Sequence, residues 1–145
     1  MAALTIYDKT QFNRPEWKVL NAPARRQAAR DYLAGKKCFG GLDLSTTTDL
    51  TAFTLLFPPQ EGLDTWAVLF WAWRPEEGVL EAEQRDHVPY RDWARAGFLA
   101  LCPGDMVDFT MVEDAVAAAA DVFDLDTLGV DPLPVPHAVT PRLME

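Results

Sequence analysis

Three closely spaced apolar segments constrain the fold more than any other feature of this sequence. They are "KCFGGLDL" (residues 37–44), "LTAFTLLF" (residues 50–57) and "TWAVLFWAWR" (residues 65–74). Each has the length and apolar content typical of a β-strand. The linkers "STTTD" and "PPQEGLD" are too short for a crossover, and two adjacent prolines cannot lie inside a strand ladder. The segments therefore predict a three-stranded antiparallel meander. The third segment is apolar on both of its alternating faces, which predicts a strand that is central in its sheet.

The character of the sequence changes to helical after residue 74. "PEEGVLEAEQRD" and "VPYRDWARAGFLAL" predict two helices, the second stopped by Gly97. "TMVEDAVAAAADVF" (residues 110–123) is the clearest helix, because Thr110 and Glu113 have capping-box spacing and precede an apolar stripe. "TLGVDP" predicts a last strand, which a right-handed crossover would place parallel to one of the first three. The expected fold class is α/β, with a mixed sheet.

Residues 1–36 are expected to form a lead-in or linker segment. They are polar, and they contain one predicted helix from Pro23 to Leu33, which ends before Gly35. The N-terminus lacks the basic flank and apolar block of a signal peptide. The longest apolar runs are too short to cross a bilayer, so no membrane partner and a cytoplasmic location are expected.

Composition narrows the possible partners. The net charge of −9 over 145 residues argues against a general nucleic-acid surface, since phosphate binding relies on Lys and Arg. The basic segment at residues 24–37 could contact a polyanion locally, or it could be an exposed helix face. Cys38 and Cys102 lie in apolar surroundings without metal-ligand spacing, which predicts reduced thiols in the core.

Two aspartates occupy matching places at the ends of predicted strands. Asp43 ends the first strand, and Asp131 ends the last one. If these strands are neighbours, about 4.8 Å apart, the two carboxylates converge at one end of the sheet. A divalent cation would remove the repulsion between them, and paired oxygen-ligated ions can drive phosphodiester hydrolysis. The alternative is structural, because Asp43 could cap the "STTTD" turn and Asp131 could start a turn before Pro132.

A family resemblance favours the metal site. "CFGGLDLSTTTDLTAFTLLFPP", "FWAWRPEEGVLE", "VPYRDWARAGFLALCPGDMVDFTMVEDAV" and "LGVDP" together resemble the nuclease domain of tailed-phage terminase large subunits. The four pieces occur in the family's order, and the stretch that contains them, from Cys38 to Pro132, makes up about two-thirds of the chain. The resemblance implies an RNase H-like fold at residues 37–145 and a metal-dependent endonuclease that cuts concatemeric DNA during genome packaging.

The resemblance also assigns residues and partners. It makes Asp43 and Asp131 catalytic metal ligands, with Asp49 an additional acid near the same Mg²⁺ or Mn²⁺ ions in a two-ion site. The implied partners are double-stranded DNA, an ATPase motor domain or chain, the terminase small subunit and the portal, all in the bacterial host cytoplasm. The family's third metal carboxylate lies further downstream, but here Glu145 is the sole acid after Asp131. We therefore expect a nuclease domain that is truncated or incomplete at its C-terminal end.

Two other functions remain open. An actin-like or sugar-kinase ATPase also has an Asp-containing strand, a Ser/Thr turn and a second strand, as in "LDLSTTTDLTA". That sequence lacks the glycine that lets backbone amides approach a phosphate. A catalytically impaired remnant could instead keep the fold and act as a binding module.

Overall fold

The computed structural model describes residues 23–131, which belong to two units that meet between Ala34 and Gly35. The described part of the first unit contains helix α3 (Pro23–Leu33), as predicted. Gly35 adopts a φ of +70°, a left-handed conformation typical of the residue that follows a helix. No helix in residues 23–131 is long and apolar enough to span a membrane.

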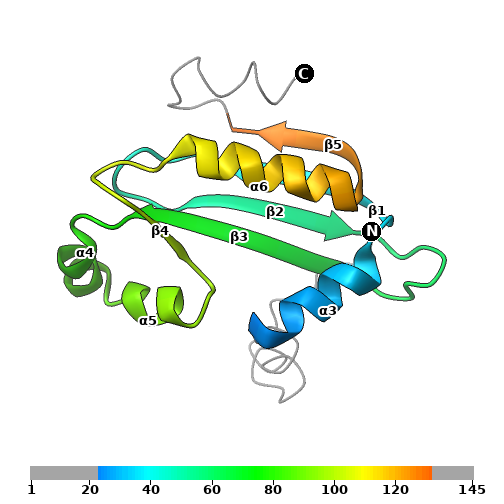
Figure 1. Ribbon diagram of the computed structural model, residues 1–145, viewed down its shortest axis with the longest axis horizontal. Helices are drawn as coiled ribbons and strands as arrows, with labels where there is room; N and C mark the ends of the chain where they lie inside the picture. The colour runs from blue at the N-terminus through cyan, green and yellow to red at the C-terminus, as the bar shows by residue number, and fades with distance from the viewer. Residues whose placement is uncertain (1–22, 132–145) are drawn as a thin grey trace. The chain divides into compact units, whose positions relative to one another are not determined.

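The second unit is built on a five-stranded mixed sheet with the order β4-β3-β2-β1-β5 (Figure 1). Strands β1 (Lys37–Asp43), β2 (Thr51–Phe57) and β3 (Ala67–Pro75) form the predicted antiparallel meander. Strand β5 (Asp124–Val130) pairs in parallel with β1, as the crossover rule predicts. The fold is mixed α/β, as expected.

Helix α6 (Phe109–Val122) covers one face of this sheet, here called the α6 face (Figure 1). The helix begins one residue earlier than predicted, because Asp108 is its N-cap and accepts a hydrogen bond from the Thr110 N–H. The predicted Thr110–Glu113 capping box is therefore wrong. The side chains buried on or against this face include Cys38, Leu42, Phe53, Leu55, Phe57, Val112, Val116, Ala119 and Phe123.

Both cysteines are buried free thiols, which confirms the prediction from their surroundings. Cys38 belongs to β1, and Cys102 belongs to the short strand at the opposite edge of the sheet. Burial raises the pKa of the Cys38 thiol to about 11 and also raises the pKa of Cys102. Neither thiol is activated as a nucleophile by its surroundings.

The opposite side of the sheet, here called the outer face, carries the alternate side chains of the same strands. Helices α4 (Val79–Asp86) and α5 (Tyr90–Arg95) pack at one end of it, in a cluster that includes Ala72 of β3. Elsewhere on this face Val68 and Phe70 of β3 are exposed. The third strand was predicted to be central: β3 does pair with a strand on each side, β2 and β4, but the middle strand of the five is β2.

Strand β4 (Ala100–Cys102) was not predicted from the sequence. The helix predicted before it stops near Gly97, as expected: α5 ends at Arg95, and Gly97 turns the chain with a φ of +80°. The chain then pairs in parallel with Trp73–Pro75 of β3. A three-residue strand is too short to show an alternating pattern, so the sequence contains no signal for it.

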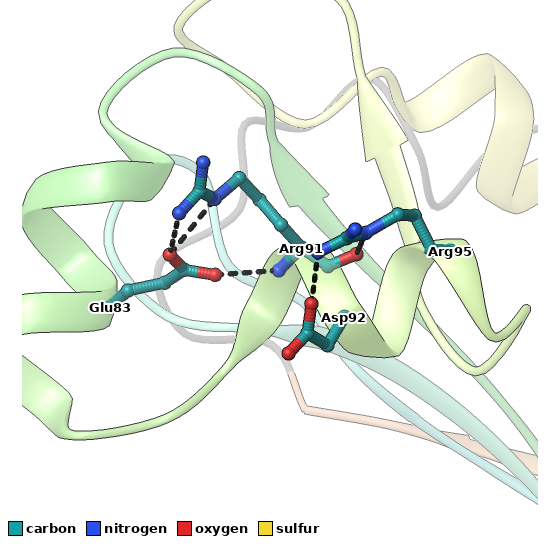
Figure 2. Close-up of polar contacts among 4 residues, drawn as sticks. All are labelled: Glu83, Arg91, Asp92 and Arg95. Carbon is teal, nitrogen blue, oxygen red and sulfur yellow. Dashed lines mark hydrogen bonds and ion pairs between the residues drawn. The ribbon is translucent and has the colours of Figure 1, made fainter.

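A pair of charged side chains joins α4 to α5 (Figure 2). The Glu83 carboxylate accepts hydrogen bonds from the Arg91 backbone N–H, at 2.8 Å, and from Arg91 Nε, at 2.9 Å. A carboxylate at a helix N-terminus also interacts favourably with the helix dipole. These contacts lower the pKa of Glu83. Within α5, Arg95 pairs with Asp92.

Candidate functional site

Asp43 and Asp131 lie next to each other at the carboxyl ends of two parallel strands. Leu42 pairs with Val130, and the Asp131 N–H donates to the Leu42 carbonyl at 3.0 Å. The ladder thus continues to the residues that follow this pair, Asp43 and Asp131. Strict alternation along β1 places Asp43 on the outer face, away from α6. Both aspartates are exposed to solvent.

Asp49 lies in the loop at residues 44–50, which joins β1 to β2 and is here called the β1–β2 loop. The buried Thr51 side chain closes this loop: its hydroxyl donates to the Ser45 carbonyl and accepts from the Ser45 N–H, both at 2.9 Å. The Thr46 carbonyl accepts from the Val107 N–H at 3.0 Å. The Asp49 N–H donates to Ser45 Oγ at 3.2 Å. The loop is therefore held by specific polar contacts.

The donor set suits a hard divalent cation held through few protein ligands. Two adjacent, solvent-exposed carboxylates supply oxygen atoms, and Mg²⁺ prefers one or two carboxylates together with several waters. Within residues 23–131, no group of three or more His, Cys, Asp and Glu side chains is arranged to hold a metal. Asp49 therefore does not complete a three-carboxylate group with Asp43 and Asp131 in this structure. The β1–β5 pairing places Asp43 and Asp131 side by side.

Sequence reasoning missed Arg74, a charged residue on β3 that reaches the same loop. Its side chain is 4% exposed, and Nη1 donates to the Thr48 carbonyl at 2.9 Å. The guanidinium carbon lies 4.5 Å from the centre of the Tyr90 ring, a cation–π distance. Its position after the apolar run "FWAW" was a usable signal, because an arginine at the end of an apolar strand needs a buried partner.

From the Tyr90 ring that Arg74 contacts, hydrogen bonds continue into α4. Tyr90 Oη donates to Asp86 Oδ2 at 2.9 Å, and Arg85 pairs with the same carboxylate, with Nε 2.7 Å from Oδ1. The bonds from Arg85 and Tyr90, together with the charge of Arg74, lower the pKa of Asp86. Burial raises the pKa of Tyr90, as does its bond to Asp86. The anionic Asp86 thus complements two arginines.

Comparison with known proteins identifies the relatives of this chain. No protein-family model matches the sequence. A curated protein, the terminase large subunit of Enterobacteria phage HK97, is 34% identical over 96 residues, or 66% of this chain. The crystal structure of the HK97 large terminase matches 69% of this chain with a TM-score of 0.56 and 32% identity.

The chain is related to the large subunit of phage terminases. The aligned region spans 19% of the curated terminase and 22% of the chain in the crystal structure, about a fifth of each. The agreement of sequence and structure over the same share of this chain confirms the predicted family and the RNase H-like fold.

Proposed function

We propose that this terminase homologue forms part of a metal-dependent DNA endonuclease domain, with Asp43 and Asp131 as its metal ligands. The observation that carries the proposal is the parallel β1–β5 pairing, which brings these carboxylates together in a chain related to large terminases. Cutting of concatemeric double-stranded DNA during packaging, in the host cytoplasm, is the function this proposal assigns. A motor domain or chain, a small subunit and a portal are the packaging partners it implies.

The proposed division of labour follows from charge. Asp43 and Asp131 would hold Mg²⁺ or Mn²⁺, which neutralises their mutual repulsion and gives a phosphate a cationic contact on an acidic protein. Asp49 is proposed as an auxiliary ligand, acting directly or through water. Ions held there would supply polarisation of the scissile phosphate and activation of a water for in-line attack. Both aspartates are exposed, so that ions and a phosphate group from solvent could reach them.

Plasmid nicking tests the proposal most directly. Supercoiled DNA is incubated with the full 145-residue chain and Mn²⁺, Mg²⁺ or chelator, and the Asp43→Asn variant is assayed beside it. We expect slow nicking, faster with Mn²⁺ than with Mg²⁺, that chelator and Asp43→Asn both abolish. The matched control is Asp121→Asn, which removes the same charge from an exposed position on α6 and should cut like the wild type.

Calorimetric titration with Mn²⁺ separates the other functions. Metal binding that Asp43→Asn removes, without any cutting by the wild type, would indicate a binding module in place of a nuclease. Chelator-resistant cutting, or full activity in Asp43→Asn, would contradict the metal-nuclease proposal. Binding of a nucleoside triphosphate in place of Mn²⁺ would support the actin-like or sugar-kinase alternative.

A further inference from the structure

Two buried polar side chains meet at the β1–β2 loop. Among residues 27–131, Thr51 and Arg74 are the polar or charged side chains that are buried, at 0% and 4% exposure. Thr51 bonds Ser45, and Arg74 bonds the carbonyl of Thr48. Burial of polar groups costs free energy and is tolerated where specific hydrogen bonds compensate it. The hydrogen bonds that offset the cost of burying these two side chains are therefore made to one short loop.

The contact of Arg74 bears on Asp49 through a single peptide unit. The carbonyl of Thr48 and the N–H of Asp49 belong to the same planar group. Arg74 Nη1 binds that carbonyl at 2.9 Å, and Ser45 Oγ binds that N–H at 3.2 Å. With both ends bound, the orientation of the peptide is fixed. The Asp49 N–Cα bond is fixed with it, which limits the directions that the Asp49 side chain can take.

Arg74 is itself held in one orientation by α4 and α5. The Tyr90 ring stacks against the guanidinium, and the Tyr90 hydroxyl is bound by Asp86. Residues on both sides of the contact share one apolar cluster, since Leu50 and Ala72 pack against Val79, Ala82, Tyr90 and Leu99. Arg74 Nε is nevertheless buried without a hydrogen-bond partner among the described residues. The arginine thus retains an unsatisfied donor while it binds the loop.

We propose that Arg74 is a positioning residue, which fixes the Thr48–Asp49 peptide and thereby aims the Asp49 carboxylate in the loop that follows Asp43. A planar guanidinium suits this role because it can stack on Tyr90 and donate sideways to a carbonyl at the same time. A lysine would keep the charge but would lose this combined geometry. The inference rests on the proposed function only for the role of Asp49 toward a metal ion.

Amide hydrogen exchange tests the positioning role without metal or DNA. In the full chain, the hydrogen-exchange rate of the Asp49 amide is divided by the exchange rate of the Leu55 amide, which lies in the central strand β2. We expect Arg74→Met to raise this ratio roughly tenfold or more, as the loss of a charged hydrogen bond would. Arg74→Lys should raise it by less. Equal acceleration of Asp49 and Leu55 in Arg74→Met would mean general destabilisation and would overturn the proposal.

Two controls isolate the contact. Arg85→Met removes an exposed arginine of the same Asp86–Tyr90–Arg74 network that has no bond to Thr48, and it should leave the ratio unchanged. Val116→Ala lowers stability from the α6 face and should also leave the ratio unchanged. If Arg74→Met does not fold, Arg74→Lys decides: a ratio equal to that of the wild type would show that the guanidinium is not required.

Titration with Mn²⁺ then connects the loop to the metal. We expect Arg74→Met to weaken Mn²⁺ binding roughly tenfold, as loss of an outer-shell partner does. Unchanged affinity for Mn²⁺ would contradict a role for Arg74 in the metal site. A wild-type chain that binds no Mn²⁺ would refute the proposed function instead, whereas the exchange ratio would still decide whether Arg74 orders the loop.

Discussion

The two faces of the sheet differ sharply in how well their side chains are buried. On the α6 face Phe53 is fully buried, and its ring stacks on Trp71 with the centroids 5.0 Å apart. On the outer face Phe39, Val68 and Phe70 each remain about 40% exposed. The same strands supply both sets, so the difference arises from what packs against each face. Helix α6 lies along one face, whereas α4 and α5 cover only one end of the other.

The two faces of the sheet therefore differ in role: the α6 face stabilises the second unit, and the outer face can carry a functional site. Apolar burial on the α6 face provides the hydrophobic free energy that holds β1 and β5 in register. Asp43 belongs to the outer face, where solvent can reach a carboxylate and a bound ion. Rigid, buried elements thus present exposed charged groups, an arrangement common at binding sites.

The largest expected effect comes from truncating matched aromatic residues on the two faces. Phe53→Ala on β2 should lower the free energy of unfolding by about 3–5 kcal/mol, because it leaves a cavity in the core. Phe70→Ala on β3 should cost no more than about 1.5 kcal/mol, since its ring already contacts water. Urea denaturation followed by tryptophan fluorescence measures both changes.

The size of the difference between the two losses is the critical result. Losses of equal size at Phe53 and Phe70 would show that the outer face is covered in solution. A loss at Phe53 below about 1.5 kcal/mol would mean that the site collapses around the smaller side chain. Either result would remove the contrast between the faces.

Much of the fold was predictable because local sequence and tertiary structure agree. The apolar segments of β1 and β2 are bounded by turn residues, and α3 runs between Pro23 and Gly35 as predicted. Chirality predicted that the last strand would lie parallel to one of the first three, and β5 pairs in parallel with β1. The sequence placed Asp43 and Asp131 together only on the condition that these two strands are neighbours, which the structure meets.

Other features depend on contacts that no local pattern reports. Strand β4 forms because Trp73–Pro75 offers a free edge, although its own three residues have little strand signal. Arg74 looked like the end of an apolar strand, but the carbonyl that it binds lies 26 residues earlier in the chain. The exposure of Val68 and Phe70 likewise depends on which face the helices cover, and the sequence of β3 is apolar on both.

Two neighbouring glycines of β1 provide a second, smaller test of the comparison. A Cβ at Gly40, on the α6 face, would lie 2.7 Å from Leu128 Cδ1 and 3.3 Å from Leu125 Cδ1. A Cβ at Gly41, on the outer face, would meet no atom within 4 Å. We expect Gly40→Ala to cost about 1–3 kcal/mol through overpacking. Gly41→Ala should be neutral or stabilise by up to about 1 kcal/mol, because it restricts the unfolded chain.

Thermal and urea denaturation of the two alanine variants measures this difference with one matched chemical change. If Gly40→Ala is as stable as Gly41→Ala, the leucine side chains of β5 move aside at little cost. The α6 face would then be less tightly packed near β5 than its buried residues indicate. A loss of stability in Gly41→Ala would instead indicate that another surface contacts the outer face at this position in solution.

The smallest expected effect is at Val68, and it tests the outer face most sensitively. Val68 pairs across the sheet with Leu56, which pairs in turn with Phe39, so the three residues form one row on this face. Val68→Thr keeps the β-branched shape that favours strands and adds a hydroxyl that water can satisfy. The free energy of unfolding should change by no more than about 0.5 kcal/mol. The matched change Val112→Thr, on the buried side of α6, should cost about 1–3 kcal/mol because its hydroxyl has no water to bind.

If Val68→Thr costs as much as Val112→Thr, then another surface covers the row of Phe39, Leu56 and Val68 in solution. Repeating the measurement over a range of protein concentrations would show whether that surface belongs to a second copy of the chain, since only then would the loss of stability grow with concentration.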